Sequence, residues 1–136
     1  MHTPVPRTLA LRSSDATYPG STEHIRAVRA DLRALLGDCP MADDVILCAS
    51  ELAANAAVHS RSRLPGGTFT IHVKINPSHY AWIGVEDDGG PWMAIGSDPT
   101  RPHGLEIVRA LASRWGVDSD QTTRTIWATF DWAGRA

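Results

Sequence analysis

One segment limits what this chain can fold into more than any other. Residues 45–58 read VILCASELAANAAV, and only Ser50, Glu51 and Asn55 among them are polar. A helix this apolar has to be covered on most of its sides, because its apolar surface does not fit a single stripe. The segment Met41–His59 is therefore predicted to be a helix that other elements surround.

The carboxylate in this helix needs an explanation. An unpaired buried carboxylate is costly enough to shift its pKa or to unfold the site, so Glu51 must border a cleft or have a partner. Glu51, Asn55 and His59 follow one another at four-residue steps, which places them in one polar stripe along the helix.

Two interpretations of this stripe stay open. In the first, Glu51 and Asn55 bind backbone groups or an arginine and only fix the packing. In the second, a carboxylate and an amide oxygen one turn apart hold a hard cation or polarise a nucleophile, and these oxygens suit Mg²⁺. His59 belongs to this site or is only the polar end of the helix.

The rest of the chain predicts one α/β (α+β) domain. Its 136 residues suit a single domain, expected to cover 1–136 with a flexible segment 1–7. The order of elements suits a two-layer sandwich, with a mixed but mostly antiparallel sheet and helices on one face. The expected elements are a strand-like run Thr8–Leu11, helices Ser21–Leu36 (with Ser21 as N-cap), Met41–His59 and Gly104–Arg114, strands Thr68–Asn76, Tyr80–Asp87, Trp115–Val117 and Thr123–Asp131, and a loop Asp88–His103.

Two further motifs follow the polar stripe along the chain. The sequence VEDDGGP, residues 85–91, places carboxylates at the end of a strand and follows them with two glycines. Glycines allow a sharp turn and a close approach of the backbone to a ligand. At His103-Gly104-Leu105 a glycine opens a helix, whose N-terminal N–H groups suit a phosphate. His72 falls on the solvent side of its strand, and no role is assigned to it.

Composition argues against several classes of protein. Thirteen basic residues face fifteen acidic ones, for a formal charge of −2, and no basic stripe suggests contact with a nucleic-acid backbone. Lys74 is the only lysine and no Gly-Lys pair occurs, which argues against a P-loop. No apolar run of signal-peptide or membrane-span length stands out, so we expect no membrane partner and a cytoplasmic location.

Taken in order, ELAANAAVH, VEDDGGP and HGLEIV resemble the N, G1 and G2 boxes of the GHKL ATPase superfamily of gyrase, Hsp90, histidine kinases and MutL. The sequence is most similar to the anti-sigma factor serine kinases, small ATP-binding regulators of the actinomycete type. The similarity runs from Pro19-Gly20 to the strand at 124–128. It implies the Bergerat, or histidine-kinase-like ATPase, fold with ATP and Mg²⁺ as cofactors.

The resemblance also implies roles for single residues. Glu51 matches the general base, and Asn55 matches the asparagine that completes the Mg²⁺ shell at the ATP phosphates. Asp87, with Asp88 as the alternative, matches the aspartate that accepts a hydrogen bond from the adenine amino group. The other expected nucleotide contacts are His59, Gly89 beside the adenine, Gly104 at the phosphates, Leu105, and Thr125, which resembles the threonine that closes the adenine pocket.

One position departs from the family pattern. Pro102 stands where the G2 box usually has its first glycine. Proline fixes φ and lacks an N–H donor, so we expect a stiffer lid, one phosphate contact fewer and slow turnover.

The resemblance implies a regulator that binds ATP and acts on another protein. It would phosphorylate a serine of a STAS-type anti-sigma antagonist and would sequester a sigma factor, and a homodimer is compatible with it. Pro102 favours an alternative, a protein-interaction module that binds ATP without transferring phosphate. A third and unrelated class is a metal-dependent hydrolase built on Glu51, His59 and His103.

Overall fold

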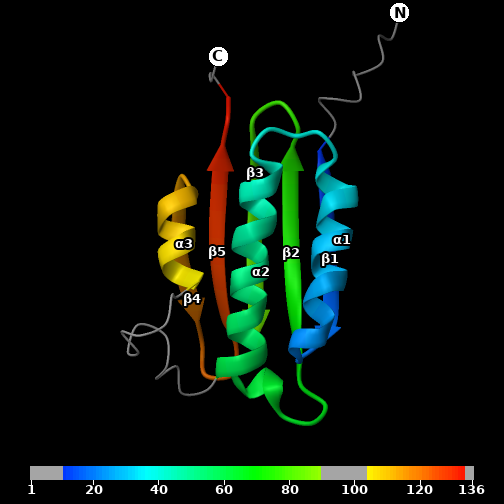
Figure 1. Cartoon of the computed structure of the whole chain (residues 1–136). Coiled ribbons are helices and arrows are strands. Elements are labelled where there is room, and N and C mark those ends of the chain that lie inside the picture. Colours follow the sequence, from blue (N-terminus) through cyan, green and yellow to red (C-terminus); the bar gives the residue numbers. More distant parts are fainter. Residues whose placement is uncertain (1–10, 90–103, 134–136) are drawn as a thin grey trace, which may run out of the picture.

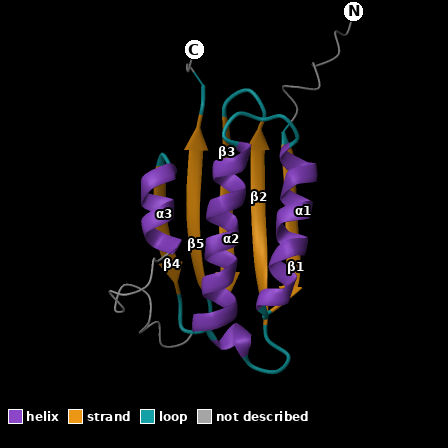
Figure 2. Ribbon diagram, viewed as in Figure 1, coloured by secondary structure: helices purple, strands orange, loops and turns teal. Residues whose placement is uncertain are grey.

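The computed structural model describes residues 11–89 and 104–133, which form two layers. A five-stranded sheet makes one layer, and the described α-helices all lie on one of its faces (Figures 1 and 2). The helical elements are η2 (Thr22–His24), α1 (Ile25–Leu36), α2 (Ala42–His59), η3 (Arg61–Arg63) and α3 (Gly104–Leu111). The strands are β1 (Arg12–Pro19), β2 (Thr68–Asn76), β3 (Tyr80–Asp87), β4 (Arg114–Ser119) and β5 (Arg124–Asp131).

The strands lie in the order β1-β2-β3-β5-β4, and each of the four described pairings is antiparallel. The chain therefore passes from β3 through α3 to the edge strand β4 and returns to the centre with β5. The predicted two-layer sandwich with helices on one face is confirmed, and the described sheet contains no parallel pair. None of the helices in the described ranges is long and apolar enough to cross a membrane.

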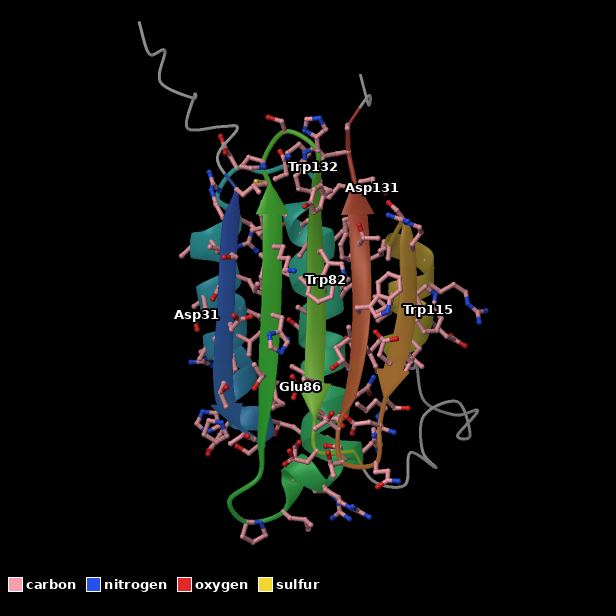
Figure 3. All side chains as sticks on the ribbon, turned by 180° about the vertical axis from the view of Figure 1, so that it is seen from behind. Asp31, Trp82, Glu86, Trp115, Asp131 and Trp132 are labelled. Carbon is pink, nitrogen blue, oxygen red and sulfur yellow. The ribbon has the colours of Figure 1, made fainter. Side chains whose placement is uncertain are left out.

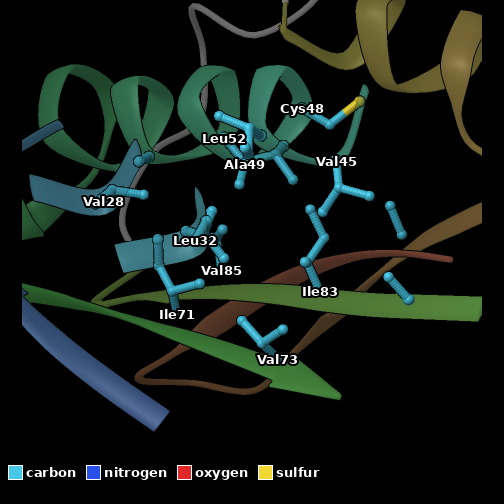
Figure 4. Packing of buried hydrophobic residues seen from close by; sticks show 14 of the residues in the cluster. Val28, Leu32, Val45, Cys48, Ala49, Leu52, Ile71, Val73, Ile83 and Val85 are labelled. Atoms are coloured by element: carbon cyan, nitrogen blue, oxygen red, sulfur yellow. The ribbon is translucent and has the colours of Figure 1, made fainter. Parts of the chain in front are cut away.

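The core lies between α2 and the middle of the sheet (Figure 4). Alternate residues of a strand point to the same face, so β2 and β3 each present an apolar row to the helices. These rows meet Val45, Ala49 and Leu52 of α2. The buried members from the two strands are Phe69, Ile71, Val73, Ile75, Ala81, Ile83 and Val85.

The first strand lies later in the sequence than predicted. The expected run was Thr8–Leu11, but β1 spans Arg12–Pro19, and Leu11 is 70% exposed. Residues 8–10 lie outside the described residues. β1 is an edge strand that alternates small and polar residues, and only Tyr18 of its eight side chains is buried. The apolar signal that marks a strand in a sequence is therefore weak at this edge.

Two predicted helix boundaries were also wrong. Ser21 occupies the N-cap position of the 3₁₀ turn η2, as predicted, but makes no side-chain capping hydrogen bond, and the α-helix itself begins only at Ile25. At the other boundary α3 ends at Leu111, and β4 begins at Arg114, within the range predicted as helix. The Ser113 N–H donates to the Thr129 carbonyl (2.8 Å), so the chain has already joined the sheet there.

The opposite face of the sheet carries no described helix and is called the open face. Trp82 and Glu86 of β3 lie on it (Figure 3). His72 of β2 lies beside them and contacts two carboxylates, with Nδ1 2.6 Å from Asp15 and Nε2 2.8 Å from Glu86. The imidazole therefore joins three neighbouring strands, β1, β2 and β3.

This arrangement predicts a pH-dependent contribution to stability. Burial disfavours the charged imidazole, but hydrogen bonds and charges from Asp15 and Glu86 outweigh it and raise the pKa of His72 above 6.5. The stabilisation is therefore full below about pH 6.5 and is lost as the pH rises through the folded-state pKa. In urea unfolding, His72→Gln is expected to lose roughly 1 kcal/mol at pH 6 and progressively less toward pH 9.

His79→Gln provides the control, because His79 is exposed on the turn between β2 and β3. It should leave the pH profile of the wild type unchanged. A stability difference for His72→Gln that stays constant from pH 6 to pH 9 would contradict the assignment.

Candidate functional site

The predicted polar stripe lies on α2. Glu51, Asn55 and His59 are all partly buried, in a helix whose other side chains are largely apolar. In the described ranges no basic side chain lies within 4.0 Å of the Glu51 carboxylate. Arg29, which approaches this helix from α1, donates instead to Ser50 Oγ (3.1 Å). The described contacts thus contain no arginine that neutralises Glu51.

Asn55 carries a buried polar atom with unused hydrogen-bonding capacity. Its Nδ2 has no hydrogen-bond partner among the described residues. Buried amide groups are nearly always satisfied, and such an orphan calls for a ligand or for the opposite orientation of the amide. With Nδ2 toward the site, the amide can donate to a phosphate oxygen. In the flipped orientation, Oδ1 can bind Mg²⁺, so the side chain fits the predicted cation site.

Asp87 ends β3 on the helix side of the sheet and is only 3% exposed. The Gly89 N–H donates to its Oδ1 (2.7 Å), and Gly89 has a φ of 71°, which glycine adopts without strain. Burial raises the pKa of the Asp87 carboxyl, and the Gly89 N–H and the Arg124 guanidinium offset only part of this rise. The charged form of the buried carboxylate is therefore incompletely stabilised, and a further hydrogen-bond donor would stabilise it.

The 3₁₀ turn η3 ties the end of α2 to the turn that follows Asp87. The Asp88 N–H donates to Ser62 Oγ (2.9 Å), and the Arg61 N–H donates to the Gly89 carbonyl (2.8 Å). Ser62 N–H in turn donates to Ser60 Oγ (3.0 Å), whose hydroxyl donates to the Ala56 carbonyl of α2. The predicted N-box and G1-box segments thus meet at one end of the molecule (Figure 1).

No sequence pattern singled out Ser60, the N-cap of η3, or Ser62 within η3, and both are buried. Ser62 is fully buried, and the chain packs tightly around its carbonyl. A Cβ at Gly20 would lie 1.7 Å from the Ser62 oxygen, and one at Gly67 would lie 2.3 Å from it. These two glycines allow η3 to dock against the ends of β1 and β2.

Arg124, rather than Thr125, is the β5 residue that faces Asp87. The two are paired in the sheet register, and an Arg124 guanidinium nitrogen lies 3.6 Å from Asp87 Oδ1. Thr125 pairs with Glu86, a residue of the open face. Since neighbouring residues of a strand point to opposite faces, the structure does not bring Thr125 to the helix side where Asp87 lies.

The remaining predicted residues lie at the start of α3. Gly104 is the first residue of that helix, and Leu105 packs partly buried against the core. Pro102, His103 and most of the predicted loop Asp88–His103 lie outside the described residues. The part of the chain that is described holds no group of three or more His, Cys, Asp or Glu side chains placed to bind a metal ion.

A solved structure shares this architecture. The crystal structure of the RsbU and RsbW domains of Rv1364c from Mycobacterium tuberculosis matches it with a TM-score of 0.69 at 20% sequence identity. The match covers 88% of this chain but 32% of that chain, so the present sequence spans about a third of its length. At this identity the likeness establishes the fold alone. The sequence matches no family model and no curated protein.

The link through η3 can be tested by a single substitution. Ser62→Ala removes the acceptor of the Asp88 N–H and leaves that group without its partner, which costs about 1–3 kcal/mol. We expect the melting temperature measured by circular dichroism to fall by roughly 3–10 °C. Ser119→Ala, on the exposed end of β4, is the matched control and should change it little. Equal melting temperatures for both variants would contradict the role of Ser62.

Proposed function

We propose that this chain binds Mg²⁺·ATP between α2 and the end of β3 and transfers the γ-phosphoryl group to a serine of a partner protein. The observation that carries the proposal is the stripe of Glu51 and Asn55 on an otherwise apolar helix, tied through η3 to the turn after Asp87. A helix of this composition gains nothing in packing from an acid and an unsatisfied amide.

Each residue would contribute a separate function. Glu51 would accept the proton of the attacking serine hydroxyl, and Asn55 would hold Mg²⁺ through its amide oxygen. Bound Mg²⁺ would balance phosphate charge, which removes the need for a P-loop lysine. Asp87 would accept a hydrogen bond from the adenine amino group, and Gly104, at the N-terminus of α3, would offer an N–H to phosphate.

The partners proposed for this activity follow from the family resemblance. They are a STAS-type antagonist, which would receive the phosphoryl group, and a sigma factor, which the unphosphorylated antagonist would displace. The shared fold with a structure that contains an RsbW domain supports a regulatory role of this kind.

One observation favours a second candidate, a protein-interaction module without phosphoryl transfer. The buried Arg124 beside Asp87 already supplies a counter-ion at the end of the pocket expected to hold adenine. A chain of this kind would bind its partner with little or no dependence on nucleotide. Calorimetry with Mg²⁺·ATP, followed by transfer assays with labelled ATP, separates the two functions.

Removal of the proposed base tests the chemistry. Glu51→Gln is expected to lower the rate of phosphoserine formation on STAS-type antagonist domains by about 10²–10⁴-fold, because the amide cannot accept the hydroxyl proton. The Kd for Mg²⁺·ATP should stay within about threefold of the wild type. Glu23→Gln, an exposed substitution in η2, is the control and should transfer at the normal rate. Equal transfer by Glu51→Gln, or none by the wild type, would refute the kinase proposal.

Asn55 provides a test of the cation site. The wild type is expected to bind ATP more tightly with Mg²⁺ than with EDTA, and Asn55→Ala should lose most of that difference because it lacks the amide oxygen. Calorimetric titrations under both conditions give the four affinities. Asn76→Ala, at the end of β2, should keep the Mg²⁺ effect. A full Mg²⁺ effect in Asn55→Ala would place the cation elsewhere.

A further inference from the structure

A buried arginine lies at the base end of the proposed nucleotide pocket. Arg124 is 9% exposed and Asp87 is 3% exposed, and an Arg124 guanidinium nitrogen lies 3.6 Å from Asp87 Oδ1. The pairing of the two residues between β3 and β5 fixes this approach, because both side chains point to the helix side of the sheet. The family resemblance implies no role for position 124.

Arg124 approaches the Asp87 oxygen that already accepts a backbone hydrogen bond. Asp87 Oδ1 accepts the Gly89 N–H at 2.7 Å and also lies closest to the guanidinium. An arginine keeps its positive charge even when buried, so the cation holds the carboxylate by electrostatic attraction at low solvent exposure. A neutral amino group of a base offers a weaker interaction with the same carboxylate than a cation does.

The length of the side chain adds a steric argument. The resemblance assigns the closed end of the adenine pocket to Thr125, but the β5 residue that pairs with Asp87 is Arg124, which has a three-carbon stem and a planar head. A buried stem of this size fills volume that a threonine leaves empty. A base that approaches Asp87 therefore meets the guanidinium beside the carboxylate.

We propose that Arg124 is the affinity-determining residue of the pocket, because its guanidinium competes with the base of the nucleotide for Asp87. The inference rests on the proposed function, since it assumes that the base binds at Asp87. It predicts that the wild type binds nucleotide weakly although Glu51, Asn55 and Asp87 are all present.

Calorimetric titration of the full chain with Mg²⁺·ATP tests the inference. Arg124→Thr is expected to lower the Kd at least tenfold, because the competing cation and its stem are removed together. Arg114→Thr, an exposed substitution on the neighbouring strand β4, should leave the Kd within twofold. Circular dichroism of each variant verifies that it is folded.

A second variant covers the case in which Arg124→Thr does not fold. Arg124→Met keeps the apolar stem and removes the charge, and it is also expected to lower the Kd, by at least threefold. If the wild type binds Mg²⁺·ATP and the folded Arg124 variants bind it equally or less tightly, the inference is overturned. Weaker binding in these variants would make Arg124 a contact of the ligand. Absence of binding in the wild type and in every folded variant would overturn the proposed function itself.

Discussion

The burial of α2 is the constraint on which the rest of this structure depends. The sheet covers this helix from behind in the view of Figure 1, and α1 and α3 flank it on its two sides. Val45, Ala49, Leu52 and Ala53 are almost fully buried as a result, and each buried apolar side chain of the size of valine or leucine contributes about 1.5–3 kcal/mol relative to an exposed one. Three covering elements are needed because the apolar residues of α2 occupy most of its circumference.

Because α2 is buried on most sides, its polar side chains need hydrogen-bond partners. Ser50 is satisfied by bonds within the fold, since its hydroxyl donates to the Ile46 carbonyl (2.7 Å) and accepts from Arg29. Among the described residues, Glu51 forms no ion pair and the Asn55 Nδ2 has no hydrogen-bond partner. Ser50 thus contributes hydrogen bonds to the fold, whereas Glu51 and the Asn55 Nδ2 make no such described contact, although all three residues lie within two turns of one helix.

Sequence periodicity predicted the elements that have a strong apolar pattern. It failed for residues whose position depends on contacts with distant segments of the chain. The alternation in β2 and the apolar run of α2 predicted the bounds of β2 and, within one residue, those of α2. β1 was misplaced because an edge strand of small polar residues has little apolar signal. Ser62 acts through contacts with Asp88, 26 residues later, which no local pattern indicates. Arg124 could have been found, because Ile126, Ala128 and Phe130 already define the inward face of β5 and Arg124 continues that series.

The pair of Asp87 and Arg124 is hard to explain as a device for stability. Burial raises the pKa of Asp87 and lowers that of Arg124, so in both residues it disfavours the charged form, and each partner offsets only part of the effect. Well-packed apolar residues at such positions are often as stable as a buried ion pair or more stable. Both charges nevertheless lie beside the turn that η3 holds against the end of α2. Packing alone therefore gives no clear reason for a polar pair at the place where the two candidate binding segments meet, and the pair is compatible with the ligand site proposed there.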